Sequence, residues 1–312
     1  TEEEQMHPFL WRFWTKMPSK GRIAIYDSSW YRKVLIDRFD KKTKKKEVAD
    51  AYRSICSFEE QLTDDGMVLI KIFLAIDKKE QKKRLEKLLS SKETSWRVSE
   101  GDLKRNKEFG EYEAINEEML MRTDTEYAPW NIVEAVDRRF ATAKIYAIVA
   151  QTLAGKVEEV RRKERLGQFK EEEITEPEKE TAQDKKLTES ILAKADLSLS
   201  YSKEEYRKRL EQLQKKMEKL HGELYRRRIP VVLGFEGWDA GGKGGAIKRL
   251  TQKMDPRGYV VHPTASPNDI ERAHHYLWRF WVDMPKAGHI TIFDRTWYGR
   301  VMVERIEGFC TK

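Results

Sequence analysis

The sequence predicts an α/β fold with parallel sheets sandwiched between helices, arranged as two duplicated domains that are each incomplete here. Three observations support this prediction: a gapless internal repeat, a glycine-rich loop between a strand-like and a helix-like run, and several short apolar runs typical of buried strands. A length of 312 residues suffices for roughly two domains of ordinary size.

The composition argues against several classes of protein. Hydrophobic residues make up 39% of the chain and charged residues 37%, and no run approaches the roughly 18 apolar residues of a membrane-spanning helix. Nine tryptophans indicate a packed core rather than a disordered chain. The two cysteines, Cys56 and Cys310, have no metal-binding spacing, and no export signal is visible. We therefore expect a reducing, cytoplasmic setting and no membrane partner.

The internal repeat is the strongest signal of domain organisation. Residues 10–38 read LWRFWTKMPSKGRIAIYDSSWYRKVLIDR and residues 277–305 read LWRFWVDMPKAGHITIFDRTWYGRVMVER, at a constant offset of 277 − 10 = 267 residues. Of the 29 positions, 15 are identical, including tryptophans at helical spacing that we interpret as core or interface packing. Gapless agreement in Trp, Pro and Gly indicates a duplicated domain rather than two similar amphipathic helices.

The two copies lie near opposite ends of the chain, which predicts two cut domains. We assign residues 1–154 to the C-terminal half of the first domain and residues 198–312 to the N-terminal half of the second. Between them, residues 155–197 are rich in Glu, Lys and Arg, as in a linker or a solvated helical arm. Apolar residues spaced by three or four predict an amphipathic helix over residues 202–228.

Six short apolar runs are expected to form strands, near residues 22–27, 67–76, 130–135, 230–235, 258–262 and 289–294. The sequence leaves two arrangements open. Strands from both halves could complete one sheet in permuted order, or each half could need a segment that is not in this chain.

A glycine-rich loop follows the predicted strand at 230–235. The motif Gly237-Trp238-Asp239-Ala240-Gly241-Gly242-Lys243-Gly244 stands between that strand and a predicted helix, a context that favours phosphate binding. Glycines let backbone N–H groups point at phosphate oxygens, the helix N-terminus adds partial positive charge, and Lys243 can reach a phosphate. The glycines predicted to bind phosphate are Gly237, Gly241, Gly242 and Gly244.

Two acidic residues are candidate Mg²⁺ ligands. The usual motif ends in Ser or Thr, whose hydroxyl ligates Mg²⁺, but Gly244 occupies that position and the loop carries Asp239 instead. A carboxylate among phosphates is unfavourable unless a cation lies between them. Asp294 ends a predicted strand in the second repeat copy, where we expect it to lie beside the loop.

Arg295 follows Asp294 and could clamp the oxygens of a transferring phosphoryl group. It completes the predicted catalytic set of Asp239, Lys243, Asp294 and Arg295. In the first repeat copy the corresponding residues are Asp27 and Ser28, so that copy keeps the acid and lacks the arginine.

Four segments together resemble polyphosphate kinase family 2, in its duplicated-domain form: GFEGWDAGGKGGAIKRL, DPRGYVVHPT, LWRFWVDMPKAGHITIFDRTWYGRV and MLMRTDTEYAPWNIVEA. The resemblance implies a P-loop kinase fold, Mg²⁺ as cofactor, and transfer of a terminal phosphoryl group from inorganic polyphosphate to AMP, giving ADP. It also implies a basic lid near residues 83–107, in which Arg97 would face phosphates.

Other functions stay open at this point. An ATP-dependent nucleoside monophosphate kinase would use the same loop chemistry, and a non-catalytic or incomplete chain would act only in assembly. A chain that must borrow half a sheet is expected to form a homo-oligomer. The net charge of 61 − 53 = +8 suits a polyanionic partner. Because the tryptophans cluster in the repeat instead of alternating with basic residues, we expect no nucleic acid as partner. The resemblance implies inorganic polyphosphate and AMP or ADP as partners.

Overall fold

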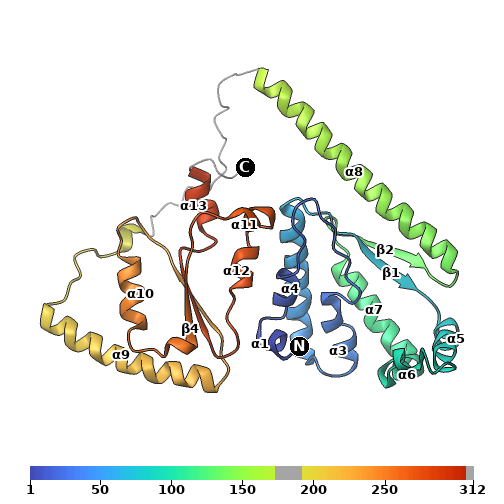
Figure 1. The fold of residues 1–312 in the computed structure, drawn as a ribbon, viewed down its shortest axis with the longest axis horizontal. Coiled ribbons are helices and arrows are strands. Elements are labelled where there is room, and N and C mark those ends of the chain that lie inside the picture. The colour runs from blue at the N-terminus through green and yellow to red at the C-terminus, as the bar shows by residue number, and fades with distance from the viewer. Residues whose placement is uncertain (173–191, 307–312) are drawn as a thin grey trace. The chain divides into compact units, whose positions relative to one another are not determined.

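The computed structural model describes residues 1–172 and 192–306, and Figure 1 shows their fold. It is a mixed α/β structure in which parallel strands are flanked by helices, as predicted. The chain forms two compact units: Thr1–Ile25 together with Lys179–Lys312, and Tyr26–Glu178. Residues 1–25, which the sequence groups with the first half, thus belong to the same unit as the second half.

The sheet of the first unit has three parallel strands. β3 (Val231–Phe235) and β4 (Tyr259–Pro263) flank β5 (Ile290–Asp294), in the order β3-β5-β4. The register places the last residues of the three strands opposite one another, so the strands end at the same edge. The three strands predicted in this half are confirmed.

The helices of the first unit are α1 (Glu2–Met6), α2 (Trp11–Trp14), α9 (Lys203–Arg226), α10 (Lys243–Thr251), α11 (Asp269–Ala273), α12 (Trp278–Val282) and α13 (Gly299–Ile306), with 3₁₀ turns η3 (Leu192–Lys194) and η4 (Pro256–Gly258). α9 confirms the predicted amphipathic helix. It begins with a capping box, in which the Ser202 hydroxyl accepts a hydrogen bond from the Glu205 N–H.

Helices cover both faces of this sheet. Ile290 and Ile292 of β5 form a core cluster with Ile247 of α10, and α9 packs against the same cluster. Successive side chains of a strand point to opposite faces. Accordingly, Phe293 meets Phe280 of α12 edge-on, with ring centroids 5.6 Å apart. Figure 1 shows α10 and α12 on opposite sides of the strands.

Equivalent helices of the two repeat copies, α2 and α12, pack against each other. Trp14 stacks on its own repeat equivalent, Trp281, with centroids 5.5 Å apart and planes 11° from parallel. Trp14 is 1% exposed. The predicted packing role of the repeat tryptophans is confirmed for this pair.

Two backbone hydrogen bonds flank this contact. The Lys20 N–H donates to the Ala273 carbonyl at 2.7 Å, and the Ala287 N–H donates to the Met6 carbonyl at 2.7 Å. The two bonds are equivalent, because Lys20 corresponds to Ala287 and Met6 to Ala273 at the repeat offset of 267 residues. The two copies therefore meet around a local pseudo-twofold axis, as in an isologous interface between identical subunits.

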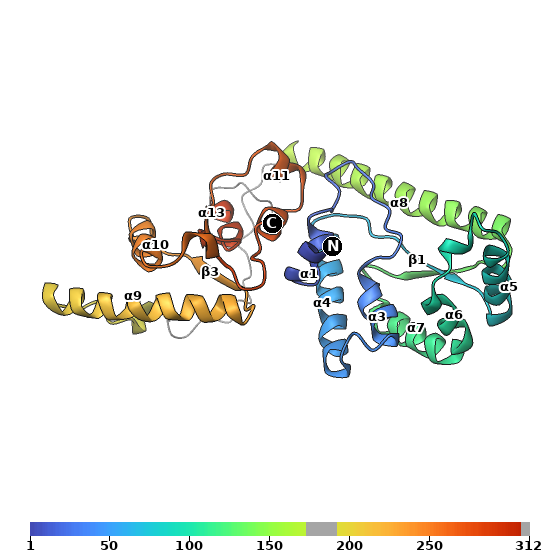
Figure 2. The same cartoon turned by 60° about the horizontal axis from the view of Figure 1, so that its bottom comes forward.

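The second unit is built around two parallel strands, β1 (Lys71–Ala75) and β2 (Trp130–Glu134). Its helices are α3 (Ile36–Phe39), α4 (Lys45–Asp64), α5 (Lys78–Leu89), α6 (Glu100–Lys107), α7 (Phe109–Thr123) and α8 (Arg138–Glu172), with 3₁₀ turns η1 (Trp30–Lys33) and η2 (Ser95–Arg97). α8 packs on one side of the strands and α6 and α7 lie on the other (Figures 1 and 2).

The segments predicted in this half have different outcomes. Both later strands are confirmed, although the one predicted at 67–76 is shorter, covering Lys71–Ala75. The predicted linker, residues 155–197, begins inside α8, which continues to Glu172, and its residues 173–191 lie outside the described residues. Strands β1 and β2 form a sheet separate from β3-β5-β4, so the described residues do not form one permuted five-stranded sheet.

The strand predicted at residues 22–27 is wrong: this segment has no regular structure. Ile23 and Ile25 are 77% and 92% exposed, whereas their repeat equivalents Ile290 and Ile292 are 1% and 0% exposed. The equivalent strand, β5, is hydrogen-bonded on both edges, by β3 and β4. No described strand pairs with residues 22–27, so the same apolar pattern has no ladder to join.

Beyond Asp27 and its equivalent Asp294, the difference in exposure is reversed: side chains of the first copy are buried and their equivalents in the second copy are exposed. Tyr31 and Val34 are 5% and 0% exposed, and their equivalents Tyr298 and Val301 are 54% and 63% exposed. In the first copy, η1 and the residues after it pack against α3 and α4. Among the described residues of the first unit, no helix takes the place of α4.

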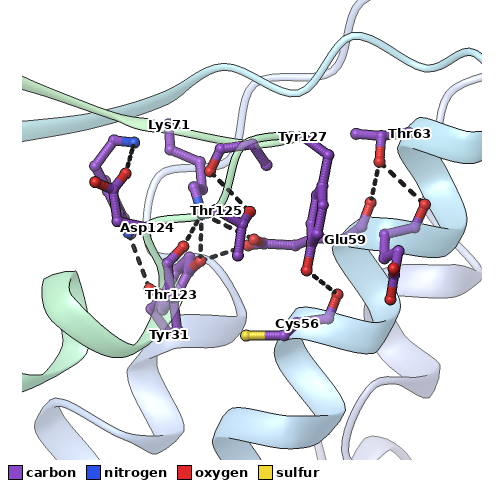
Figure 3. A network of polar contacts seen from close by, with 12 residues as sticks. Tyr31, Cys56, Glu59, Thr63, Lys71, Thr123, Asp124, Thr125 and Tyr127 are labelled. Carbon is purple, nitrogen blue, oxygen red and sulfur yellow. Dashed lines mark hydrogen bonds and ion pairs between the residues drawn. The ribbon is translucent and has the colours of Figure 1, made fainter.

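A buried polar network fastens η1, α4 and β1 to one another (Figure 3). Lys71 Nζ donates to Glu59 Oε2 at 2.9 Å, to the Thr123 carbonyl at 2.6 Å and to the Tyr31 hydroxyl at 3.2 Å. Glu59 Oε1 also accepts from Trp30 Nε1 and from the Tyr31 hydroxyl. Burial and the neighbouring Glu59 carboxylate raise the pKa of Tyr31 far above its usual range, so the phenol stays protonated and donates.

None of the helices described in residues 1–172 and 192–306 is long and apolar enough to cross a membrane.

Candidate active site

The glycine-rich loop leaves β3 at the edge where the three strands of the first unit end, and runs directly into α10. Its backbone needs unusual angles: Gly237 has φ +148°, Ala240 has φ +60° and Gly242, the N-cap of α10, has φ +87°. A Cβ at Gly241 would stand 2.9 Å from the Trp238 carbonyl oxygen. The glycines therefore permit a tight turn that brings backbone N–H groups to a helix N-terminus.

Lys243 is the first residue of α10, and its side chain turns back across the loop. Lys243 Nζ donates to the carbonyls of Gly237 at 2.8 Å and Trp238 at 3.1 Å. The ammonium group thus lies against the loop backbone, within the turn that the glycines form. A phosphate held by the loop would compete with these two carbonyls for the ammonium protons.

Asp294 and Arg295 stand at the end of the neighbouring strand, β5. Asp294 is paired in register with Phe235, the residue that ends β3 before the glycine-rich loop. Arg295 has a left-handed backbone, φ +70°, and its N–H donates to the Phe235 carbonyl at 3.0 Å. Its guanidinium donates to Asp239 Oδ1 at 3.2 Å. The four predicted catalytic residues therefore lie on two neighbouring segments, the connection from β3 into α10 and the end of β5, at one edge of the sheet.

The Asp239–Arg295 pair is exposed to solvent. The Asp239 side chain is 93% exposed and the Arg295 side chain 51% exposed. Exposed ion pairs contribute only about 0–1 kcal/mol, and salt weakens them. The pair can therefore separate readily when either side chain is offered a stronger partner, such as a cation for the carboxylate or a phosphate for the guanidinium.

Oxygen donors at this edge suit Mg²⁺, which commonly takes one or two carboxylates and completes its shell with water and substrate phosphates. Asp239 supplies a carboxylate from the glycine-rich loop, and Asp294 supplies one from the end of β5. Among the described residues, no group of three or more His, Cys, Asp or Glu side chains could hold a metal ion. The donor chemistry of the two aspartates fits Mg²⁺ bound together with phosphate.

Three further residues at this edge were not singled out from the sequence. Glu236 Oε1 accepts hydrogen bonds from the Thr296 N–H at 2.6 Å and the Thr296 hydroxyl at 2.7 Å. The Thr264 hydroxyl, beyond β4, donates to the Arg295 carbonyl at 2.6 Å. Glu236 directly precedes the glycine motif and Thr296 follows Arg295, so their position beside the motifs was the available signal.

Arg97, the predicted phosphate ligand of the lid, lies in the other compact unit. It ends η2, and its guanidinium is 5.3 Å from the centroid of the Trp96 ring, which is 75% exposed. The predicted lid at 83–107 consists of most of α5, then η2 and α6.

Comparison with known proteins shows the family of the chain. The sequence model of the family described as Polyphosphate kinase 2 matches residues 1–162 and 200–312. The chain belongs to the polyphosphate kinase 2 family.

Two curated relatives match almost the whole chain. A polyphosphate:AMP phosphotransferase of Pseudomonas syringae pv. tomato is 36% identical over 320 residues, covering 100% of this chain and 61% of the relative. A polyphosphate:AMP phosphotransferase of Pseudomonas aeruginosa is 37% identical over 310 residues, covering 99% of this chain and 60% of the relative. The chain thus spans about three fifths of the length of these relatives.

A solved structure has the same fold. A crystal structure described as a polyphosphate kinase 2 from Pseudomonas aeruginosa PA01 superposes with a TM-score of 0.76 at 34% identity. It covers 100% of this chain, and the chain covers 57% of that structure. The parallel sheets flanked by helices are therefore those of a polyphosphate kinase 2.

Proposed function

We propose that this protein transfers a terminal phosphoryl group from inorganic polyphosphate to AMP, giving ADP, with Mg²⁺ as cofactor. The observation that carries the proposal is a contact between the end of β5 and the glycine-rich loop. Arg295, the residue that follows Asp294, donates a hydrogen bond from its guanidinium to Asp239 of that loop. Arginine, lysine, aspartates and helix N–H groups gathered at one sheet edge form a set suited to phosphoryl transfer. The names of the two curated relatives favour polyphosphate and AMP as substrates.

In this proposal the loop N–H groups and Lys243 hold phosphate oxygens, and Arg295 balances charge on the group in transfer. Asp239 and Asp294 would hold Mg²⁺, which when bound neutralises phosphate charge. An oxygen of the AMP α-phosphate attacks the terminal phosphorus of the polymer in line, and the bond to the next phosphate breaks. The products are ADP and a polyphosphate one unit shorter. Arg97, in the predicted lid of the other compact unit, stays a predicted phosphate ligand.

We also propose the domain organisation expected from the repeat. Residues 1–154 would form the later part of one polyphosphate kinase 2 domain and residues 198–312 the earlier part of another. The complementary exposure of the two repeat copies supports this division: the isoleucines exposed at 23 and 25 are buried at 290 and 292, and the tyrosine exposed at 298 is buried at 31. Assembly with further copies of the chain and residence in the cytoplasm belong to the same proposal.

The experiment is ADP formation from AMP, polyphosphate and Mg²⁺, with ATP supplied as donor in a parallel reaction. Lys243→Ala should reduce the initial rate by about a hundredfold or more, because it removes the positive charge that stabilises the phosphoryl group during transfer. Lys248→Ala, on an exposed position of the same helix, is the matched control and should keep the wild-type rate.

Two results would overturn the proposal. A folded Lys243→Ala protein with wild-type turnover would remove the loop from the mechanism. ADP formation from ATP but not from polyphosphate would favour an ATP-dependent nucleoside monophosphate kinase instead.

A further inference from the structure

The loop after β5 has a strained conformation that some other group must hold. Arg295 is a non-glycine residue with φ +70°, in the left-handed region that side chains disfavour. Its repeat equivalent, Ser28, has φ +66°, so the turn belongs to the repeated segment and does not depend on the arginine side chain. The conformation matters in the second copy because it directs Arg295 toward the glycine-rich loop.

The ion pair between Arg295 and Asp239 is poorly suited to hold the turn. Both side chains are largely exposed, so water and salt screen their attraction. Asp239 also precedes Ala240, which itself has a left-handed backbone, φ +60°, so its own position depends on a second disfavoured turn.

Glu236 makes a stronger connection. Its Oε1 accepts both the N–H and the hydroxyl of Thr296, at 2.6 and 2.7 Å, so two hydrogen bonds converge on one charged oxygen. Thr296 is buried, and its methyl group packs over β3, where a Cβ added at Gly234 would stand 2.8 Å from it. The residue after Arg295 is thereby fixed between the glycine-rich loop and the strand that precedes it.

We propose that Glu236 is a positioning residue: it ties Thr296 to the start of the glycine-rich loop and so holds the Arg295 guanidinium over that loop. Glu236 acts through two hydrogen bonds and does not itself contact phosphate or metal. The consequence for phosphate binding rests on the proposed function, whereas the consequence for the loop itself does not.

The direct test is amide hydrogen exchange of the full chain, without ligand. Glu236→Ala removes both acceptor bonds and should accelerate exchange in a peptide covering residues 294–300 by about fivefold or more. Glu236→Gln retains a carbonyl oxygen that can accept both bonds, so its exchange should stay within about twofold of wild type. Glu211→Ala, at an exposed site on α9, is the matched control and should leave this peptide unchanged.

The same variants separate hydrogen bonding from charge in phosphate binding. With tripolyphosphate as the probe in calorimetric titration, Glu236→Ala should weaken binding about fivefold and Glu236→Gln should restore it. Equal loss in both variants would show that the carboxylate charge acts directly, and this would overturn the positioning role. So would wild-type exchange at residues 294–300 in Glu236→Ala.

Failure of the proposed function gives a different result. In that case the wild-type protein binds no tripolyphosphate, while exchange is still accelerated in Glu236→Ala and normal in Glu236→Gln. This result would support the positioning role of Glu236 and would show that the positioned loop does not bind phosphate. If Glu236→Ala does not fold, Thr296→Val serves in its place. It keeps the backbone bond to Glu236 and loses both bonds of the hydroxyl, the one donated to Glu236 and the one accepted from the Tyr298 N–H. Its exchange should then lie between wild type and about a threefold increase, and faster exchange in Glu236→Gln than in Thr296→Val would contradict the proposal.

Discussion

Replacing Lys71 with methionine tests whether the buried network of the second unit stabilises its fold as a set of matched charges. Met keeps the length of the side chain and removes the ammonium group. The Lys71 and Glu59 side chains are 3% and 0% exposed, so neither charge can be compensated by water. In Lys71→Met the Glu59 carboxylate would keep only neutral donors, Trp30 Nε1 and the Tyr31 hydroxyl.

The expected loss is large because one buried charge remains without its partner. Breaking a buried ion pair from one side costs about 3–5 kcal/mol. The variant also leaves the Thr123 carbonyl without the 2.6 Å bond from Lys71 Nζ. In the double variant Glu59→Gln/Lys71→Met no charge is buried, and the new amide oxygen can still accept from the two neutral donors. The double variant should therefore be more stable than Lys71→Met alone.

The assay is unfolding in urea, monitored through the hydrogen exchange of peptides from α4 and β1. Peptides from β3 and β5, in the other compact unit, provide an internal control for the integrity of the sample. Lys71→Met should lose about 3 kcal/mol or more of unfolding free energy in the α4 and β1 peptides. A loss below about 1 kcal/mol, or a double variant whose loss equals the sum of the two single losses, would refute the reasoning.

Three further predictions concern the first unit. Burial lowers the pKa of His7, and the positive charge of Lys286 lowers it further. The unfolded chain therefore binds this proton more tightly than the folded chain, and the stability should fall as the pH drops below about 6.5. His7→Phe, which keeps an aromatic ring, should flatten that fall in urea unfolding at pH values on either side of about 6.5, and an unchanged slope would contradict the assignment. Gly258→Ala would push a methyl group into the buried ring of His221, which should lower the stability by about 1–3 kcal/mol. The double variant His221→Ala/Gly258→Ala should remove this clash, and an equal loss of stability in the double variant would show that the backbone at Gly258 is responsible instead. Trp14→Ala should cost about 3–5 kcal/mol by calorimetry because it empties a buried stack, and a loss under about 1 kcal/mol would mean that the α2–α12 contact does not contribute to stability.

Much of the fold follows from local sequence patterns. The short apolar runs near residues 230–235, 258–262 and 289–294 correctly predicted β3, β4 and β5, because each strand has hydrogen-bonding neighbours within its own unit. The same pattern failed at residues 22–27, where the isoleucines are exposed. Strand formation depends on a ladder partner, and a period-two pattern carries no information about whether that partner is present.

The candidate site was predictable in its chemistry but not in its internal connections. The glycine motif and the acid that ends β5 led to the prediction of Asp239, Lys243, Asp294 and Arg295. The hydrogen bonds of Glu236 depend on where two loops approach each other, which is a tertiary property without a fixed spacing in sequence. The buried pairing of Lys71 with distant groups in the second unit was missed for the same reason.

Phosphorus NMR of AMP mixed with polyphosphate, Mg²⁺ and the protein tests the central claim most directly. A β-phosphate signal of ADP should grow as the polymer signal falls, with one phosphate lost from the polymer for each ADP formed, and Lys243→Ala should abolish both changes. A folded protein that leaves both signals unchanged, or one that forms ADP only when ATP replaces polyphosphate, would contradict the account.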